Sequence, residues 1–332
     1  MFFFAHFKRN YGFARPGDVF WVDDKAASQI PKHVLFEMLP STRLMRVDPH
    51  TGDKNFLIVR SGGIGDILAL SDIARSATKV GMKVMMVTQK KMFPVVRWWS
   101  EQPASLKHFD QPLWNVKRQK LTDFLSDWGM MHGEDEIEKG GDRNWFQVFA
   151  DASGFPCTGR PQLRDIRLSI GVRNKCWGDM IIVTRSTSVM RTAPPEVFTK
   201  IQEWWNTQQK VGGVWIDIDN ASTEEYLCML YDAEMVVSVD TAAIHFREGL
   251  GKKALGVYSA FSTDCRTKYY THTRSFDVKS KCEFQPCYLH DNIGKCFYIS
   301  DGEKSAPCLT PSFNPTVEDQ IFEQFKKYTY GS

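Results

Sequence analysis

The chain has 332 residues, a length that suggests two domains. Its hydrophobic content of 42% and charged content of 24% are ordinary for a globular protein with a sizeable core. The formal net charge of only +3 does not demand a polyanionic partner, although Lys117, Arg118 and Lys120 could form a local basic face.

The sequence contains no stretch of about eighteen apolar residues, so it predicts no transmembrane helix. The apolar start, residues 1–7, is too short for the core of a signal peptide and is interrupted by His6. We therefore expect a cytoplasmic protein whose eight cysteines are thiols or metal ligands rather than a disulfide framework.

Residues 1–54 precede the main α/β pattern, and we interpret them as a small N-terminal extension. Pro16–Asp18 is a turn signal, Val19–Val22 a predicted strand and Lys25–Ile30 a predicted short helix. The sequence assigns no role to this extension.

The stretch Asn55–Leu70 opens the α/β pattern. Phe56–Val59 is a short continuous apolar run, typical of a parallel strand buried on both faces. The run breaks at Ser61–Gly63, and Gly65-Asp66 then opens a segment of helical periodicity. Strand, glycine-rich turn and helix form the first crossover of a doubly wound sheet, where ligands bind beyond the carboxyl ends of the strands. Glycines let a ligand or a second domain approach the backbone, and the helix N-terminus favours negative charge nearby.

This turn differs from two well-known phosphate-binding motifs. It lacks the Gly-Lys-Ser/Thr of a P-loop, and Leu68 stands where a dinucleotide-binding motif has its third glycine. The next predicted strand, Lys83–Val87, is followed by Thr-Gln-Lys instead of an acidic residue. The sequence therefore argues against an NAD or FAD enzyme. A purely structural interpretation of Asp66 is a helix N-cap.

Further along the first half, apolar spacing predicts helices at 93–100, 121–131 and 145–152. The charged segment 133–144 is a predicted loop, and 156–173 resembles the approach to a domain boundary.

A second α/β series follows this boundary. Predicted strands lie at 180–183, 214–218, 235–239 and 254–258, and predicted helices at 194–205, 223–231 and 240–250. Asn314-Pro315 starts a terminal helix with one apolar stripe. Two Rossmann-like halves with a cleft between them are the simplest architecture.

Two motifs carry a family resemblance. They are Arg60-Ser-Gly-Gly-Ile-Gly-Asp66 in the first half and Ser238-Val-Asp-Thr-Ala-Ala-Ile-His245 in the second. In this order the pair resembles glycosyltransferase family nine, the ADP-heptose:lipopolysaccharide heptosyltransferase family. The resemblance implies a GT-B fold, with the acceptor on the first Rossmann-like domain and the nucleotide-sugar on the second.

The resemblance also implies roles for single residues. Asp66 matches the catalytic base of the family, beside the turn glycines Gly62, Gly63 and Gly65 on the acceptor side. The segment Asp240, Thr241 and Ala242 matches the helix start that holds the ribose and diphosphate of the donor. Physical chemistry supports this second role, because a helix N-terminus presents free N–H groups to phosphate oxygens. His245, one turn later, could face the diphosphate or pack against the strand.

A second group of candidate donor ligands follows the first strand of the nucleotide domain. The family has a threonine-containing loop and a downstream lysine there, and this chain has the residues Thr184, Ser186, Thr187 and Arg191. Hydroxyls and a guanidinium are suitable phosphate ligands. The structural alternative is a solvated loop.

The chain departs from the family between Val214 and Glu234, where relatives have an additional strand–helix unit that contributes to ribose and base contacts. The departure puts the base and the heptose in doubt, and Asp217 or Asp219 could replace a ribose ligand. These two aspartates also match the Asp-x-Asp signature of metal-dependent glycosyltransferases of the other major fold, a weak match for so short a pattern.

Four cysteines near the end form a further cluster: Cys282, Cys287, Cys296 and Cys308, with His290 between them. Four thiolates, or three and an imidazole, would satisfy tetrahedral zinc. The spacings are irregular, and free thiols without a metal are the alternative.

The sequence thus predicts an α/β, GT-B-like protein with an extension at 1–54, an acceptor domain at 55–172 and a nucleotide-sugar domain at 173–332. Its predicted activity is inverting sugar transfer from a nucleotide-diphosphate sugar to a saccharide or lipid-linked saccharide, without a cofactor for the chemistry and with zinc, if present, only structural. A glycosyltransferase acting on a hydroxymethylated base in DNA is one alternative. A nucleotide-sugar-binding protein without turnover is another.

Overall fold

The computed structural model describes most of the chain. The described residues are 2–7, 9, 19–23, 29, 31–40, 55–60, 63–108, 121–125, 144–167, 179–208, 212–218, 221–287, 296, 298–299 and 302–330. Gly62, Asp219, His290 and the basic residues at 117–120 lie outside them, as do the predicted loop at 133–143 and nearly all of the predicted helix at 25–30.

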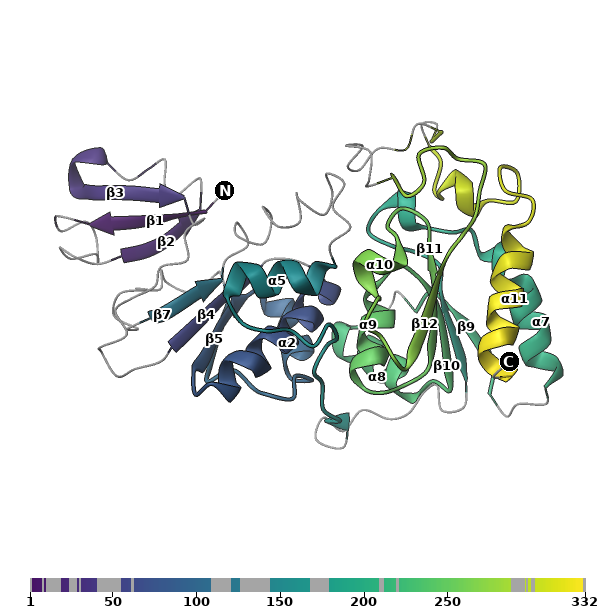
Figure 1. The fold of residues 1–332 in the computed structure, drawn as a ribbon, viewed down its shortest axis with the longest axis horizontal. Helices are drawn as coiled ribbons and strands as arrows, with labels where there is room; N and C mark the ends of the chain where they lie inside the picture. The colour runs from purple at the N-terminus through teal and green to yellow at the C-terminus, as the bar shows by residue number, and fades with distance from the viewer. Residues whose placement is uncertain are drawn as a thin grey trace.

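The N-terminal extension contains an antiparallel sheet of three strands in the order β2-β1-β3. Its elements are β1 (Phe2–Phe7), β2 (Val19–Asp23), the 3₁₀ turn η1 (Lys32–Val34) and β3 (Leu35–Pro40). The strand predicted at Val19–Val22 is confirmed as β2. This sheet lies at the end of the molecule that is remote from the C-terminal half (Figure 1).

The first α/β half has a parallel sheet in the order β6-β5-β4-β7. Its elements are β4 (Asn55–Arg60), α2 (Ile64–Lys79), β5 (Lys83–Thr88), η3 (Lys90–Met92), α3 (Phe93–Val96), β6 (Ser105–His108), β7 (Leu121–Leu125) and α5 (Trp145–Ser153). The predicted strand–turn–helix at its start is confirmed. The apolar positions of α2 are buried, which explains the helical spacing in the sequence.

One element of this half was predicted wrongly. The sequence favours a helix at 121–131, but residues 121–125 form strand β7, which pairs in parallel with β4. The apolar residues of this segment, Leu121, Phe124 and Leu125, have helical spacing, but five residues are too few for periodicity to decide, and the ladder partner on β4 makes the segment a strand. The predicted helix at 93–100 is also shorter, because α3 ends at Val96.

The second half has a parallel sheet in the order β12-β11-β10-β8-β9. Its first elements are β8 (Met180–Val183), η5 (Val189–Arg191), η6 (Pro195–Phe198), α7 (Thr199–Thr207), β9 (Val214–Ile216) and α8 (Thr223–Asp232). The remaining elements are β10 (Met235–Val239), α9 (Ala242–Gly249), β11 (Ala254–Tyr258), α10 (Thr263–Arg266), β12 (Thr273–Asp277), η8 (Pro307–Leu309) and α11 (Val317–Tyr330). The predicted strands of this half are confirmed, with β9 ending two residues early.

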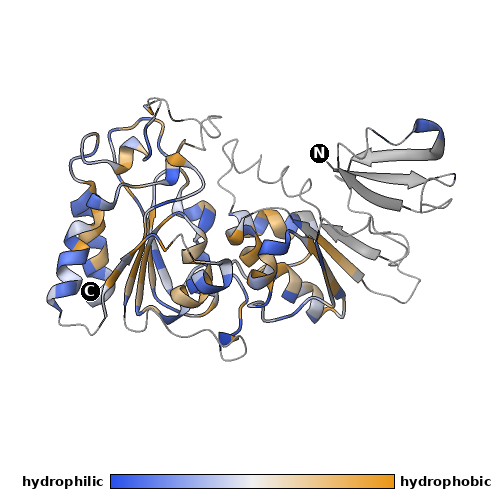
Figure 2. Cartoon of the chain, turned by 180° about the vertical axis from the view of Figure 1, so that it is seen from behind, coloured by the Kyte–Doolittle hydropathy of each residue, from blue (hydrophilic) through white to orange (hydrophobic). Residues whose placement is uncertain are grey.

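The two largest hydrophobic clusters among the described residues stabilise this arrangement. One lies between α7, α11 and one face of the second sheet, where Val317, Ile321 and Phe325 of α11 are buried. The other is continuous across both halves, and it includes Phe56 of β4 as well as Ile181 of β8. In Figure 2 the inner strands of the two parallel sheets are largely orange, the colour of hydrophobic residues, as expected for strands covered on both faces.

Helices α2 and α9 meet in the middle of the molecule and join the halves (Figure 1). The ring of Trp98 packs edge-on against Phe246 of α9, with centroids 5.0 Å apart. The Trp99 indole N–H donates to the carbonyl oxygen of Ile67 at 3.1 Å. The Trp99 contact lies within the first half, whereas Trp98 reaches the second half and is fully buried, so the contact between the halves is part of the core.

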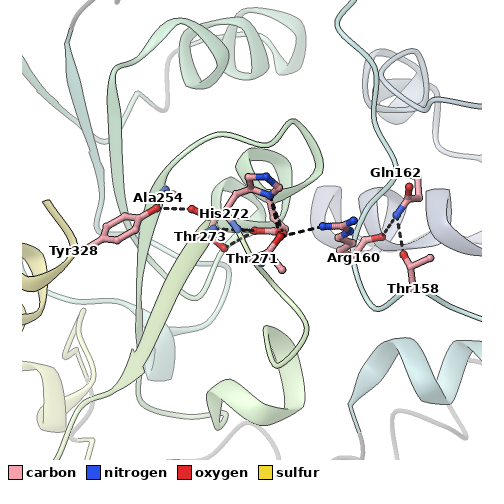
Figure 3. A network of polar contacts seen from close by, with 9 residues as sticks. Thr158, Arg160, Gln162, Ala254, Thr271, His272, Thr273 and Tyr328 are labelled. Atoms are coloured by element: carbon pink, nitrogen blue, oxygen red, sulfur yellow. Dashed lines mark hydrogen bonds and ion pairs between the residues drawn. The ribbon is translucent and has the colours of Figure 1, made fainter. Parts of the chain in front are cut away.

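The segment at 155–163 adds a polar connection between the halves (Figure 3). Arg160 Nη1 donates to Thr271 Oγ1 of the second half at 3.0 Å. Gln162 Nε2 donates to Thr158 Oγ1 at 2.7 Å. The Thr158 hydroxyl in turn donates to Asp72 of α2 at 2.9 Å. Packing and hydrogen bonds therefore hold the two halves in one relative position.

Candidate active site

The first wall of the candidate site is the turn between β4 and α2. Gly63 caps α2, and Asp66 is the third residue of the helix. One Asp66 carboxylate oxygen accepts the Gly63 backbone N–H at 2.8 Å, and the other pairs with Arg60 Nη2 at 3.2 Å. The structural interpretation of Asp66 as a capping residue is therefore partly correct. Its side chain nevertheless stays 23% exposed and faces the cleft.

Gly65 shows what the glycines of this turn make room for. A Cβ atom on Gly65 would lie 3.3 Å from His245 Cδ2 and 3.8 Å from the Cα of Ala242. The missing side chain thus allows α2 to approach the start of α9. The sequence left open a ligand or a second domain as the close neighbour of these glycines, and at Gly65 it is the second domain.

The second wall is the start of α9, which follows β10. Thr241 caps the helix, and its Oγ1 accepts the backbone N–H of Ala243 at 3.3 Å. Asp240 is buried, and its carboxylate lies 3.4 Å from Arg191 Nη1. Arg191 Nη2 also donates to Thr187 Oγ1 at 3.1 Å. Two segments far apart in the sequence therefore converge as the donor prediction requires.

His245 lies between the two walls. Its Nδ1 is hydrogen-bonded to the Tyr270 hydroxyl at 2.6 Å, and its ring centroid is 4.7 Å from that of Trp145. Burial lowers the pKa of His245 to about 4, so the imidazole is neutral at pH 7. The ring is buried and also lines the cleft, and a contact between His245 and the diphosphate stays a prediction.

These walls enclose a cleft of about 570 Å³, within the size range of small-molecule sites. Ten of the predicted site residues line it: Gly63, Gly65, Asp66, Ser186, Thr187, Arg191, Asp240, Thr241, Ala242 and His245. Its charged lining residues are Lys91, Arg185, Arg191 and Arg266 against Asp66 and Asp240. The balance of charge and the N-terminus of α9 favour an anionic ligand.

Two of the predicted donor-site residues, Thr184 and Asp217, do not line the cleft. Asp217 adopts a left-handed φ of 43°, and its carboxylate accepts the backbone N–H of Thr184 at 2.7 Å and the Thr184 hydroxyl at 2.6 Å. It also lies 3.4 Å from Arg185 Nε. These contacts tie the end of β8 to the end of β9, so both side chains support the loop in this structure.

The cysteine cluster forms a compact neighbourhood without the geometry of a metal site. Burial raises the pKa of Cys287 to about 11, with a smaller contribution from the nearby Cys296. Burial likewise raises the pKa of Cys308 to about 12, with Cys287 adding to it. Among the residues described here, no three His, Cys, Asp or Glu side chains are arranged to hold a metal ion. The cysteines among the described residues, at positions 157, 228, 265, 282, 287, 296 and 308, form no disulfide bond.

The residues that line the cleft but were not predicted as site residues include Lys91, Trp145, Tyr226 and Arg266. Arg266 lies in α10, a helix of a single turn that follows the last recognised motif and belongs to no motif itself. Trp145 was predicted only as part of a helix. The one signal for Arg266 was position, since α10 follows β11, which pairs in parallel with β10 at the predicted site.

The fold and the cleft together define the structural class: two Rossmann-like halves facing across a cleft, as in GT-B proteins. Similar solved structures include TibC, an iron-containing dodecameric glycosyltransferase from enterotoxigenic E. coli H10407, with a TM-score of 0.56 and 10% identity. That match covers 97% of this chain and 90% of TibC. A glycosyl transferase of family 9 from Veillonella parvula has a TM-score of 0.52 and 9% identity, covering 87% of this chain and 99% of the other.

A structure of TibC in complex with ADP-D-β-D-heptose gives a TM-score of 0.53 at 8% identity, covering 93% of this chain and 82% of the other. No family model and no curated protein matches the sequence. The predicted GT-B-like fold and the resemblance in fold to family nine are thus confirmed.

In the described part of the chain, no helix has both the length and the apolar character that spanning a membrane requires.

Proposed function

We propose that this protein is a glycosyltransferase that moves a sugar from a nucleoside-diphosphate sugar to an acceptor hydroxyl. The observation that carries the proposal is the cleft itself, with a carboxylate on one wall and a cationic helix start on the other. A related fold with ADP-D-β-D-heptose bound supports a nucleotide-sugar as donor. The donor would lie on residues 173–332 and the acceptor on residues 55–172.

In this mechanism the Asp66 carboxylate takes the proton of the acceptor hydroxyl. The hydroxyl oxygen attacks the anomeric carbon as the bond from that carbon to the diphosphate oxygen breaks. The electron pair leaves with the nucleoside diphosphate, and the anomeric configuration inverts. General base catalysis contributes roughly 10²–10⁴-fold to such reactions.

The leaving diphosphate is stabilised from the second wall. Arg191 supplies a guanidinium, Thr187 a hydroxyl, and the start of α9 at Thr241 its backbone N–H groups. His245 is neutral and could offer its second ring nitrogen as a hydrogen-bonding group. Such preorganised electrostatic groups supply much of the rate enhancement in many enzymes.

The acceptor is a saccharide or lipid-linked saccharide in this proposal. A hydroxymethylated base in DNA would require a duplex-binding surface, and its binding would depend steeply on salt. Transfer to oligosaccharides with weak salt dependence would favour the saccharide.

One observation favours the alternative of nucleotide-sugar binding without turnover. Both carboxylate oxygens of Asp66 already have partners, the Gly63 backbone N–H and Arg60, and an acceptor hydroxyl would have to compete with them. Donor binding without hydrolysis or transfer across an acceptor panel would support this alternative.

The experiment that tests the proposal is a thermal-shift panel of nucleoside diphosphates and their sugars, followed by transfer assays with the best donor. A ligand at one hundred times its dissociation constant stabilises the folded protein by about 2.7 kcal/mol. A panel without any stabilising nucleoside diphosphate would contradict the proposed function.

Structural zinc stays a prediction, because the four cysteines lie near one another but do not form a ligand group in this structure. Protein purified without chelators should contain about one equivalent of metal if the prediction holds, and chelation should then lower stability without a selective loss of turnover. Protein without bound metal would remove the prediction.

A further inference from the structure

Arg266 lines the cleft with a guanidinium group that contacts aromatic rings instead of a carboxylate. It ends the short helix α10, and its guanidinium carbon lies 3.9 Å from the ring centroid of Phe261 and 5.0 Å from that of Trp145. No carboxylate among the described side chains forms an ion pair with it, although it faces the cleft. Two aromatic rings thus position the guanidinium, and its N–H groups can bind an anion in the cleft.

A second guanidinium lies close to the same ring. The guanidinium carbon of Arg191 is 5.9 Å from the Phe261 centroid. The positive charges of Arg266 and Arg191 also both contribute to the lowered pKa of His245, so both act on one point of the cleft. Asp240 balances Arg191 only, at 3.4 Å. Arg266 therefore brings a positive charge into the partly buried cleft that Asp240 does not neutralise, and an anion would stabilise it.

The backbone that carries Arg266 is fixed before any ligand binds. The Asp277 carboxylate accepts the backbone N–H of Thr263 at 2.9 Å and the Thr263 hydroxyl at 3.0 Å at the start of α10. Asn144 Nδ2 donates to the carbonyl oxygen of Asp264 at 3.0 Å from the first half. A guanidinium on such a support loses little conformational freedom when it binds.

The two arginines differ in the half of the molecule that they contact. Arg191 contacts Thr187 and Asp240, which belong to the second half. Arg266 contacts Trp145 of the first half, the half that carries Asp66. In a sugar transfer with Asp66 as base, the phosphate nearest the first half is the one that bears the sugar.

From this arrangement, and resting on the proposed function, we infer that Arg266 binds the sugar-bearing β-phosphate of the donor while Arg191 binds the rest of the diphosphate. When the bond between the anomeric carbon and the β-phosphate oxygen breaks, the electron pair remains on that oxygen. Arg266 stabilises the added negative charge there. It therefore acts on the leaving group and distinguishes nucleoside diphosphates from monophosphates.

The test compares Arg266→Gln with Arg274→Gln, a matched control in which an exposed arginine outside the cleft lies 5.6 Å over the ring of Tyr328. The probes are ADP, GDP, UDP and CDP, with the monophosphate of the tightest binder, measured by calorimetry. Arg266→Gln should weaken diphosphate binding about tenfold or more and monophosphate binding about threefold or less. Arg274→Gln should change neither. Arg266→Lys, which keeps the charge without the planar fork, should retain part of the diphosphate affinity.

Equal losses for diphosphate and monophosphate, or an unchanged diphosphate affinity, would overturn the inference and leave the proposed function standing. Failure of the wild-type protein to bind any of the four diphosphates would overturn both. Should Arg266→Gln not fold, the Arg266→Lys variant decides, because the inference requires its ratio of monophosphate to diphosphate dissociation constants to fall.

Discussion

Helix α2 begins after Gly63 and helix α9 begins after Thr241, and both starts face the same cleft. At α2 a carboxylate in the first turn accepts the Gly63 N–H, so negative charge is already supplied by Asp66. At α9 the cap is a neutral hydroxyl, and the nearest carboxylate, Asp240, pairs with Arg191.

This difference assigns different chemistry to two similar supersecondary units. A helix start that carries its own anion repels a phosphate and suits a hydroxyl that must lose a proton. A helix start with a neutral cap and nearby guanidinium groups attracts a phosphate. The comparison therefore predicts that substitutions on the α2 wall change the rate of transfer, whereas substitutions on the α9 wall change donor affinity.

The largest expected effect is that of Asp66→Asn. Asparagine can still accept the Gly63 N–H, so the cap is kept, but the proton acceptor is lost. Transfer should fall by at least about 100-fold while donor affinity stays nearly intact. Steady-state kinetics and calorimetry on the same protein measure the two quantities.

Arg60→Gln is the matched control for this substitution. It removes the same 3.2 Å ion pair but keeps the carboxylate. If Asp66 is the base, Arg60→Gln should keep transfer within about tenfold of wild type. Equal losses in both variants would mean that the ion pair, and not the base, accounts for the effect.

Next in size is the effect of Arg191→Ala on the opposite wall. Nucleoside-diphosphate binding should weaken by roughly 1.5–3 kcal/mol, the usual contribution of a hydrogen bond to a charged group. Arg97→Ala is its control, because Arg97 is 58% exposed and pairs with Glu224 away from the cleft. Unchanged affinity in a calorimetric titration of Arg191→Ala would place the phosphate site elsewhere.

The contact between the walls should make stability depend on pH through His245. Its pKa is lowered from 6.5 to about 4 in the folded state, so between these values the unfolded chain binds the proton and the folded chain does not. The free energy of unfolding should therefore fall as pH decreases from 6.5 towards 4, by up to about 3 kcal/mol. Urea denaturation at pH 7 and pH 4.5 measures this.

His245→Gln should flatten this dependence, whereas His33→Gln, at an exposed position in η1, should not. A wild-type protein whose unfolding free energy is the same at both pH values would contradict the neutral buried imidazole.

The smallest expected effect on donor binding is that of Asp217→Asn. Because this carboxylate holds Thr184 and lies outside the cleft, nucleoside-diphosphate affinity should change by less than about threefold. Stability should fall by about 1–3 kcal/mol, since the hydrogen bonds between β8 and β9 are weakened. A loss of affinity for nucleosides and nucleotides alike would instead identify Asp217 as the ribose ligand that the sequence suggested.

The parts of the site that the sequence predicted are local in the chain. The turn before Asp66 and the start of α9 at Thr241 each follow a short apolar strand, and a strand–turn–helix pattern is visible in fewer than twenty residues. Parallel strands then bring such turns to the same edge of a sheet, so their place at the cleft could also be expected from the pattern.

Other features depend on partners that the local pattern does not contain. Strand β7 is decided by pairing with β4, and the contact of Arg266 with Trp145 by the approach of the two halves. The role of Asp217 as a tie depends on Thr184, thirty-three residues earlier in the chain. Periodicity reports which face of an element is buried, but only the tertiary structure decides which residue of a distant element it is buried against. The sequence by itself therefore determined the two Rossmann-like halves and the helix starts, and the tertiary structure decided which charges meet in the cleft.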